Sequence, residues 1–151
     1  MAAAATAQER LLVTRHVLCV ISEGLPRMAV LGAGDVSFGP GCLALRCQGS
    51  EMTAGVDVER HQSDPGTPTS PWQVVAEGPW QLTSGHLAVT NIEGLLEWLP
   101  GLGLGPGTWN TRVSTFGGQQ AADLEDRLLD DDEAVEEPSD GPERWLVQLW
   151  P

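Results

Sequence analysis

The sequence contains no lysine, no tyrosine and only three cysteines. Its eight arginines face 21 acidic residues, which gives a formal net charge of -13. This balance argues against binding to DNA or RNA, because affinity for nucleic acid comes from Lys and Arg that neutralise phosphates. It argues equally against an anionic membrane surface. A basic protein partner is compatible with this charge, because opposite fields speed encounter.

The small number of cysteines and the absence of long apolar runs indicate where the protein resides. Cys19, Cys42 and Cys47 form an odd, low count, which is typical of a reducing compartment. No stretch reaches the roughly 20 apolar residues of a membrane span. The start of the chain lacks a basic region, and the apolar run 17–21 is too short for the core of a signal peptide. The sequence therefore predicts a cytoplasmic protein.

The length of 151 residues fits one domain. We expect a flexible N-terminus over residues 1–10 and a single domain over 11–151. Most of the acidity belongs to an insert at 123–143, which contains 11 acids and one base and so carries -10. The remainder of the chain carries only -3.

Short segments with alternating apolar and polar residues recur along the chain, and glycine, proline and serine separate them. Side chains of a β-strand point to opposite faces in turn, so this alternation predicts half-buried strands. Only residues 121–129 follow a helical period, with Leu124 and Leu128 four residues apart. We therefore predict an all-β, two-sheet antiparallel β-sandwich with one short helix near residues 121–129. The alternating segments are 42–47, 56–59, 72–77, 87–90, 109–116 and 145–150.

A search for catalytic motifs leads to the prediction of no catalytic residue, no metal and no cofactor. The histidines His16, His61 and His86 stand apart from one another and from the cysteines, so they lack the spacing of zinc ligands. Ser84 and His86 are two residues apart without a nucleophile elbow, which indicates a turn. We predict that the chain is not an enzyme. The weaker alternative is an active site whose shifted pKa values leave no sequence motif.

Two features favour binding to a protein partner. The first is the acidic insert, whose alternatives are a solvated loop and a weak cation site. The second is tryptophan: most of the six occupy alternating strand positions typical of a core, but Trp98 adjoins a Gly/Pro-rich loop and Trp150 ends a strand. The predicted partner-binding residues are Asp123, Glu125, Asp126, Asp130, Asp131, Asp132, Glu133, Trp98 and Trp150.

Residues 72–151 carry motifs found in other proteins. These are Trp72-Gln-Val-Val-Ala-Glu77, Gly107-Thr-Trp109-Asn-Thr-Arg112-Val113 and the terminal Arg144-Trp145-Leu-Val-Gln148-Leu-Trp150-Pro151. In these motifs the chain resembles a group of small uncharacterised actinobacterial β-sandwich proteins, in which Tyr commonly stands at the positions of Trp109 and Trp145. More distantly it resembles the competence protein J family of β-sandwich nuclease inhibitors. The resemblance implies a β-sandwich.

Two functions remain open from the sequence. One is a non-catalytic interaction protein, such as an inhibitor or immunity-type protein that binds a basic partner through its acidic segment. Acidic side chains could imitate nucleic-acid phosphates in the cleft of a nuclease. The alternative is a structural or assembly component, such as a virion-associated or oligomer-forming sandwich, because the apolar terminal strand 145–150 could pair with another subunit. The oligomeric state stays open.

Overall fold

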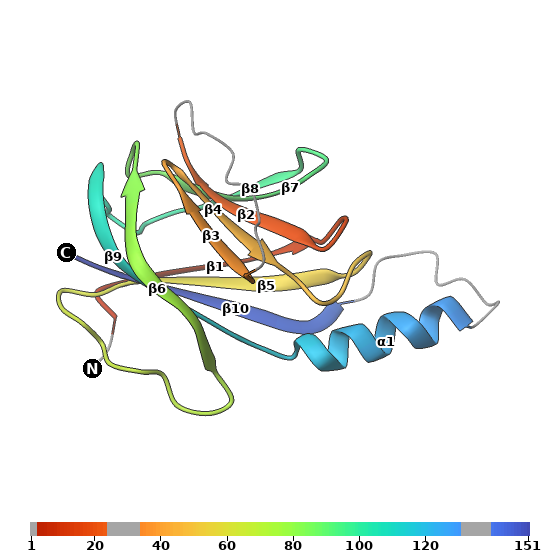
Figure 1. Cartoon of the computed structure of the whole chain (residues 1–151). Coiled ribbons are helices and arrows are strands. Elements are labelled where there is room, and N and C mark those ends of the chain that lie inside the picture. Colours follow the sequence, from red (N-terminus) through yellow and green to blue (C-terminus); the bar gives the residue numbers. More distant parts are fainter. Residues whose placement is uncertain (1–2, 24–33, 131–139) are drawn as a thin grey trace.

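The computed structural model describes residues 3–23, 34–130 and 140–151, with the side chains of 128–130 and 140 left out. The described strands form two five-stranded sheets, drawn as two layers in Figure 1. Sheet A has the order β1 (Ala5–Leu12), β5 (Thr53–Arg60), β10 (Asp140–Trp150), β9 (Gly107–Phe116) and β6 (Gln73–Leu82). Sheet B has the order β3 (Val36–Gly39), β4 (Cys42–Arg46), β2 (Val17–Ser22), β7 (Leu87–Asn91) and β8 (Leu96–Leu99).

One neighbouring pair departs from the predicted antiparallel arrangement. Strand β10 is parallel to β5, with Trp145 opposite Val56 and Val147 opposite Val58. Alternation along a strand is the same for either direction, so it could not reveal this pair. Parallel neighbours need a long connection, and β5 and β10 are far apart in sequence. The expectation of purely antiparallel sheets is therefore wrong for this pair, while the other pairs are antiparallel.

Strand β1 occupies most of the segment that the sequence suggests is flexible. Its residues pair with β5 from Ala5 opposite Arg60 to Leu12 opposite Thr53. The side chains of Ala5 and Ala7 pack against the core, and Leu11 is buried in it. Alanine carries little apolar surface, so its alternation with Thr and Gln gives a weak strand signal in the sequence.

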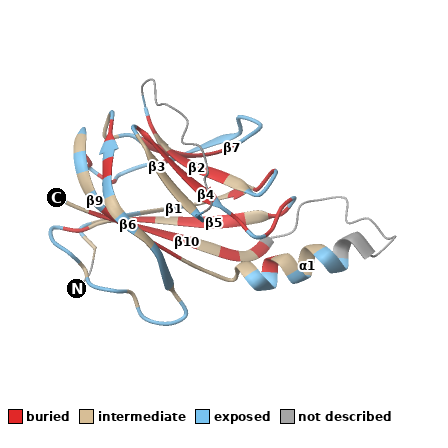
Figure 2. Ribbon diagram, in the orientation of Figure 1, coloured by how far each residue is buried: buried red, intermediate tan, exposed pale blue. Residues whose placement is uncertain are grey.

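The two sheets share one hydrophobic core, which is the buried layer between them in Figure 2. Sheet A contributes residues such as Val58 and Val147, and sheet B contributes Leu18 and Leu43. The indoles of Trp80 and Trp145 are fully buried among them. The Trp80 indole N–H donates to the Gly39 carbonyl at 3.0 Å, which ties β6 of sheet A to β3 of sheet B.

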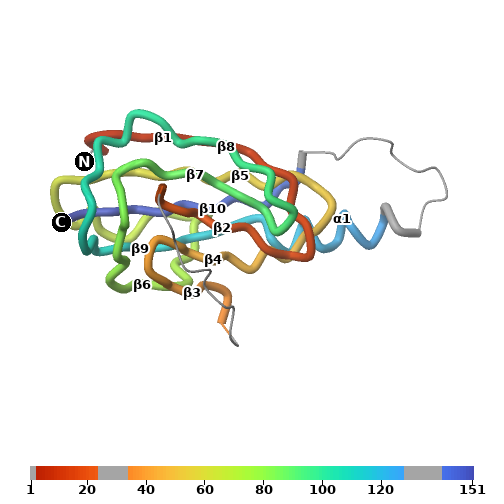
Figure 3. Tube along the Cα trace, turned by 90° about the horizontal axis from the view of Figure 1, so that it is seen from above, coloured from red at the N-terminus to blue at the C-terminus, as the bar shows by residue number. Residues whose placement is uncertain are grey.

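Strand β10 lies in the middle of sheet A, between β5 and β9 (Figure 3). Its backbone pairs with both neighbours from Arg144 to Leu149. The suggestion that strand 145–150 has an edge free to pair with another subunit is therefore wrong. The strand is apolar because it is central, since both of its edges are already paired within the sheet.

The helix α1 (Gly118–Asp130) follows β9 and extends beyond the sheets at one end (Figure 1). It begins three residues before the predicted start at residue 121. Ala121 is buried and Leu124 is half-buried, so this face packs toward β10. At 13 residues, α1 is too short to cross a bilayer, and it is the sole helix of the described chain.

Candidate protein-binding surface

The helix α1 is anchored to the loop between β4 and β5. Ala121 is fully buried, and a Cβ added at Gly49 would lie 3.0 Å from the Ala121 Cβ. A Cβ at Gly118 would lie 2.9 Å from the side-chain amide of Gln48. These short approaches leave no room for larger side chains. The start of the acidic insert is thus held firmly against the sheets.

The other end of the insert is anchored by Glu143, whose side chain is buried at 2% exposure. Its carboxylate accepts hydrogen bonds from the backbone N–H of Gln48 at 2.9 Å and of Gly49 at 3.0 Å. It also accepts from the Trp145 indole at 3.2 Å. Burial raises the pKa of Glu143, while these donors oppose the rise. Glu143 therefore fastens the start of β10 to the loop that also supports α1.

Two glycines allow the chain to pass through this junction. Gly117 has a φ of +81°, and a Cβ there would lie 2.1 Å from the Pro142 carbonyl oxygen. A Cβ at Gly141 would lie 2.5 Å from the Thr53 carbonyl oxygen. The Gly141 carbonyl accepts a hydrogen bond from the Arg10 guanidinium at 2.7 Å. Strand β1 thus contributes to the anchor as well.

Between these anchors, α1 presents carboxylates outward. Asp123 and Asp126 are exposed, and Glu125 is half-buried. Asp123 accepts one hydrogen bond, from the Gln119 side chain at 3.0 Å. Asp130 ends α1, but its side chain lies outside the described residues, as do Asp131, Asp132 and Glu133 altogether. The helix therefore presents three of the seven predicted acidic contact residues in described positions.

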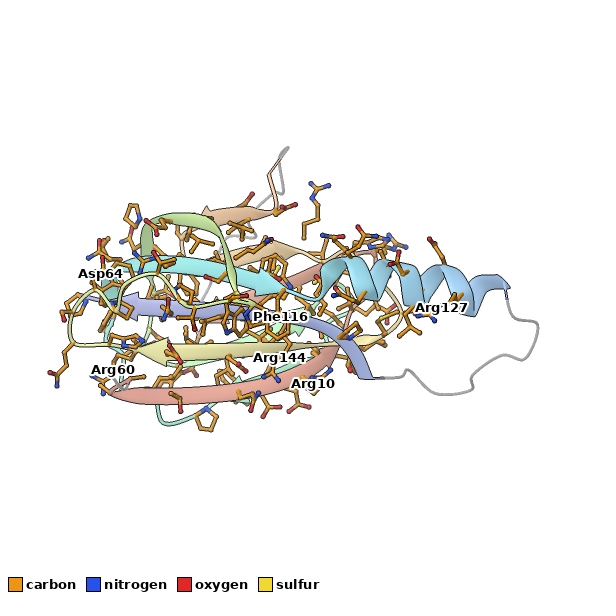
Figure 4. All side chains as sticks on the ribbon, turned by 90° about the horizontal axis from the view of Figure 1, so that it is seen from below. Arg10, Arg60, Asp64, Phe116, Arg127 and Arg144 are labelled. Carbon is orange, nitrogen blue, oxygen red and sulfur yellow. The ribbon has the colours of Figure 1, made fainter. Side chains whose placement is uncertain are left out.

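The outer face of sheet A carries charges that pair with one another across strands. Arg144 donates to both carboxylate oxygens of Asp57, at 2.9 and 3.0 Å. The Gln148 amide donates to Glu59 at 3.1 Å, and Glu59 also pairs with His61 at 3.0 Å. Figure 4 shows Arg144 beside Arg10 on this face. The charges of these residues are largely satisfied within the fold.

Arg112 is the centre of a second group on the same face. Its side chain is buried, and its guanidinium donates to Glu77, to Asp64 at 2.9 Å and to the Gly66 carbonyl at 2.9 Å. The contact lowers the pKa of Asp64. Asp64 belongs to the loop that follows β5, so Arg112 fixes this loop over the sheet.

The two tryptophans predicted as contacts differ in exposure. Trp98 is 49% exposed on β8. Trp150 is half-buried, because the Arg112 guanidinium stacks 5.0 Å from the centre of its ring. A groove of about 240 Å³ borders Trp150, with Glu77 and Asn110 in its lining. The structure does not bring Trp98 and Trp150 together, since β8 belongs to sheet B and β10 to sheet A.

The described side chains offer little nucleophilic or metal chemistry. They contain no group of three or more His, Cys, Asp or Glu positioned for a metal ion. The thiols of Cys19, Cys42 and Cys47 are buried and form no disulfide. The pKa of Cys19 is raised by its contact with Cys42, and burial raises that of Cys47, so both remain thiols at neutral pH. The Ser84 hydroxyl accepts from the backbone N–H of His86 at 3.2 Å, as in a turn.

Sequence reasoning missed a third surface, the hairpin that joins β7 to β8. Ile92 and Leu95 are 52% and 51% exposed, and Leu96 is 39% exposed. The signal in the sequence was the apolar content of residues 92–98 next to an Asn and a Gly. Alternation is broken there by the adjacent Leu95 and Leu96, so the segment does not stand out as a strand.

Comparisons with known proteins show a likeness in fold. No family model and no curated protein matches the chain in sequence. The solved structure of ComJ from Bacillus subtilis, an inhibitor of the DNA degrading activity of NucA, aligns with a TM-score of 0.57 at 13% identity. The alignment covers 94% of this chain and 92% of ComJ. The structure described as crocagin biosynthetic gene J aligns with a TM-score of 0.59 at 16% identity, over 100% and 99% of the two chains.

Proposed function

We propose that this chain is a single-domain, non-catalytic interaction protein of the inhibitor type, which binds a basic protein partner such as a nuclease. The two sheets would act as a β-sandwich scaffold for the acidic insert 123–143. Support comes from the likeness to ComJ, an inhibitor of the DNA degrading activity of NucA, over nearly the full length of both chains. The motifs of residues 72–151 remain a resemblance to actinobacterial proteins.

The observation that carries the proposal is the contrast between two sets of acidic side chains. On sheet A, Asp57 and Glu77 pair with Arg144 and Arg112 of the same sheet. Asp123 and Asp126 are exposed on a helix that is anchored at its first turns. Carboxylates on a rigid support can meet a basic cleft without a large ordering cost. We therefore assign the primary contacts to α1 and to the insert that follows it.

The test measures DNA degradation by NucA, and by any nuclease encoded beside this chain's gene, with increasing amounts of the protein. We expect stoichiometric inhibition of at least one nuclease and no cleavage by the protein itself. Changing Asp123→Asn, Glu125→Gln and Asp126→Asn together should weaken inhibition and flatten its dependence on salt.

A matched control changes the same number of charges away from α1, with Glu9→Gln, Glu23→Gln and Glu59→Gln. If the two triple variants inhibit equally, the contact is not local to α1. If no nuclease is inhibited, the inhibitor proposal fails. The alternative of an assembly component depended on a terminal strand with a free edge, and β10 is central in sheet A.

A further inference from the structure

The hairpin between β7 and β8 presents large apolar side chains to solvent. We define the hairpin patch as Ile92, Leu95, Leu96 and Trp98, which are 52%, 51%, 39% and 49% exposed. Six large hydrophobic side chains are exposed in the described chain, and four of them are in this patch. Exposed apolar side chains that cluster in this way mark interaction sites more often than single ones do.

The turn that carries the patch is held by polar contacts of its own. The Asn91 side-chain oxygen accepts from the backbone N–H of Glu93 and of Leu95, both at 3.0 Å. The Asn91 amide donates to the Leu12 carbonyl at 3.0 Å. The Thr90 hydroxyl donates to the Leu95 carbonyl at 2.8 Å. Since these bonds fix the turn, Ile92 and Leu95 are presented in a preorganised position, and less entropy is lost on binding.

A groove of about 450 Å³ adjoins the patch at Trp98. His86, Pro100, Leu102 and Leu104 line it together with Trp98. Leu102 and Leu104 are otherwise buried in the core, at 2% and 8% exposure. The groove therefore has an apolar floor beside an exposed indole, which is the setting in which tryptophan forms a binding hot spot.

The binding mode is restricted by the position of β8. Strand β8 ends sheet B, but β1 of sheet A lies against it. Leu96 and Trp98 share one face of β8, opposite Thr90 and Ala88 of β7, and this is the outer face of sheet B. A partner on this face of sheet B thus meets the side chains of Leu96 and Trp98.

The charges beside the patch decide what kind of partner fits. Two carboxylates, Glu93 and Glu97, belong to the hairpin and are exposed. Glu93 lies in the turn that carries the patch, whereas Glu97 alternates with Leu96 and Trp98 along β8 and so points to the other face of that strand. Beside the groove, the guanidinium of Arg60 is engaged by the Leu102 carbonyl, to which it donates at 2.6 Å. A second copy would bring the same carboxylates together in a symmetric interface, in addition to a net charge of -13 on each chain. Like charges oppose that pairing, whereas arginine or lysine around an apolar anchor would be attracted.

We propose that the hairpin patch and the Trp98 groove are a docking surface for a partner that presents an apolar side chain flanked by basic residues. This inference rests on the proposed function, because it names a second contact surface for the same class of basic partner. The patch supplies apolar burial, and Glu93 in the turn selects the charge. The helix α1 supplies the longer-range attraction.

A defined probe tests the chemistry without the natural partner. The probe is a short synthetic peptide that alternates leucine and arginine, and its two comparators replace arginine by glutamate or leucine by serine. Backbone amide shifts and dissociation constants are measured by NMR at physiological salt. We expect the leucine–arginine peptide to shift the amides of residues 92–98 and both comparators to bind more weakly.

The variant Leu96→Ser/Trp98→Ser should weaken binding at the hairpin by roughly ten-fold. The matched control Val74→Ser/Val75→Ser changes two side chains that are each 36% exposed on β6 and should leave that affinity unchanged. Unchanged unfolding free energies establish that both variants are folded.

Three outcomes would overturn the inference: equal binding of the leucine–glutamate peptide, shifts confined to α1 or sheet A, or a dimer in sedimentation that the hairpin variant abolishes. The last would make a second copy the occupant.

Nuclease inhibition by the same variants separates this inference from the proposed function. In one case the hairpin variant still inhibits the nuclease, the α1 variant does not, and the peptide does not bind at the hairpin. That result overturns the docking surface alone. Peptide binding at the hairpin without any nuclease inhibition overturns the inhibitor role alone.

Discussion

The outer face of sheet A and the hairpin between β7 and β8 both face solvent. Their side chains differ in whether they already have a partner within the fold. On sheet A, Arg144 and Arg112 are engaged by carboxylates of the same domain. On the hairpin, Ile92 and Trp98 have large exposed surfaces. The comparison teaches that charge alone does not identify a binding surface. What matters is whether a group already has its partner within the fold.

The largest expected effect is the loss of Glu143, which fastens the C-terminal end of the acidic insert to the loop that also supports α1. Glu143→Ala removes the acceptor of the Gln48, Gly49 and Trp145 N–H groups. Leaving these buried donors unpaired should lower the free energy of unfolding by about 3 kcal/mol. Urea denaturation measures it. The exposed Glu97→Ala is the control and should stay within about 0.5 kcal/mol of the parent.

Arg112 is the next position, because it holds the loop after β5 over sheet A. Arg112→Leu should lower the free energy of unfolding by about 2 kcal/mol, since its hydrogen bonds to Asp64, Glu77 and Gly66 are lost. The pKa of Asp64, which Arg112 lowers, should rise toward its ordinary value, and NMR titration reports it. An unchanged Asp64 pKa would show that the pair does not form in solution.

Asn91 tests whether the hairpin patch is presented by a fixed turn. Asn91→Ala removes the acceptor for Glu93 and Leu95 and the donor to Leu12. The free energy of unfolding should fall by about 1 to 2 kcal/mol. Hydrogen exchange of the 93–95 amides should accelerate well beyond that of the strands. Equal exchange in parent and variant would mean that the turn is not held by this side chain.

The raised pKa of Glu143 predicts a smaller, pH-dependent effect. Because the folded pKa lies above the ordinary value of 4.5, the stabilising contribution is complete below that value and is lost as pH rises through the folded pKa. Across this window the parent should lose stability relative to Glu143→Gln, which does not titrate. If the parent instead gains stability as pH rises, the hydrogen bonds outweigh burial and the pKa is lowered.

The smallest effect belongs to the hairpin patch itself. Leu96→Ser and Trp98→Ser remove exposed apolar surface, so each should change the free energy of unfolding by less than about 0.5 kcal/mol. Thermal denaturation with and without the leucine–arginine peptide separates stability from binding. A large loss of stability in the free protein would show that these side chains pack against the fold more closely than their exposure indicates.

Much of the fold follows from local alternation in the sequence. Val56 and Val58 in β5, and Trp145 and Val147 in β10, face the core as their spacing predicts. Alternation does not carry strand order or direction, so the parallel pairing of β5 and β10 could not be anticipated. Strand β1 was not predicted, because its alanines contribute little to the alternation of apolar and polar residues.

The candidate site was predictable in part. Asp123, Asp126 and Trp98 are exposed, as contact residues must be. Glu143 belongs to the same acidic run in sequence but is buried, because its donors at residues 48 and 49 come from a loop far away in the chain. A contact between one carboxylate and a distant loop produces no periodic pattern in the sequence. The exposed hairpin was missed because an apolar run next to a turn is usually core.

The most direct test of the account is hydrogen exchange of the protein alone and in complex with an inhibited nuclease, using the same samples as the DNA degradation assay. We predict slower exchange on binding at α1 and at residues 92–98, with the outer face of sheet A unchanged around Arg144 and Arg112. Protection centred on sheet A, with α1 and the hairpin unaffected, would contradict the account.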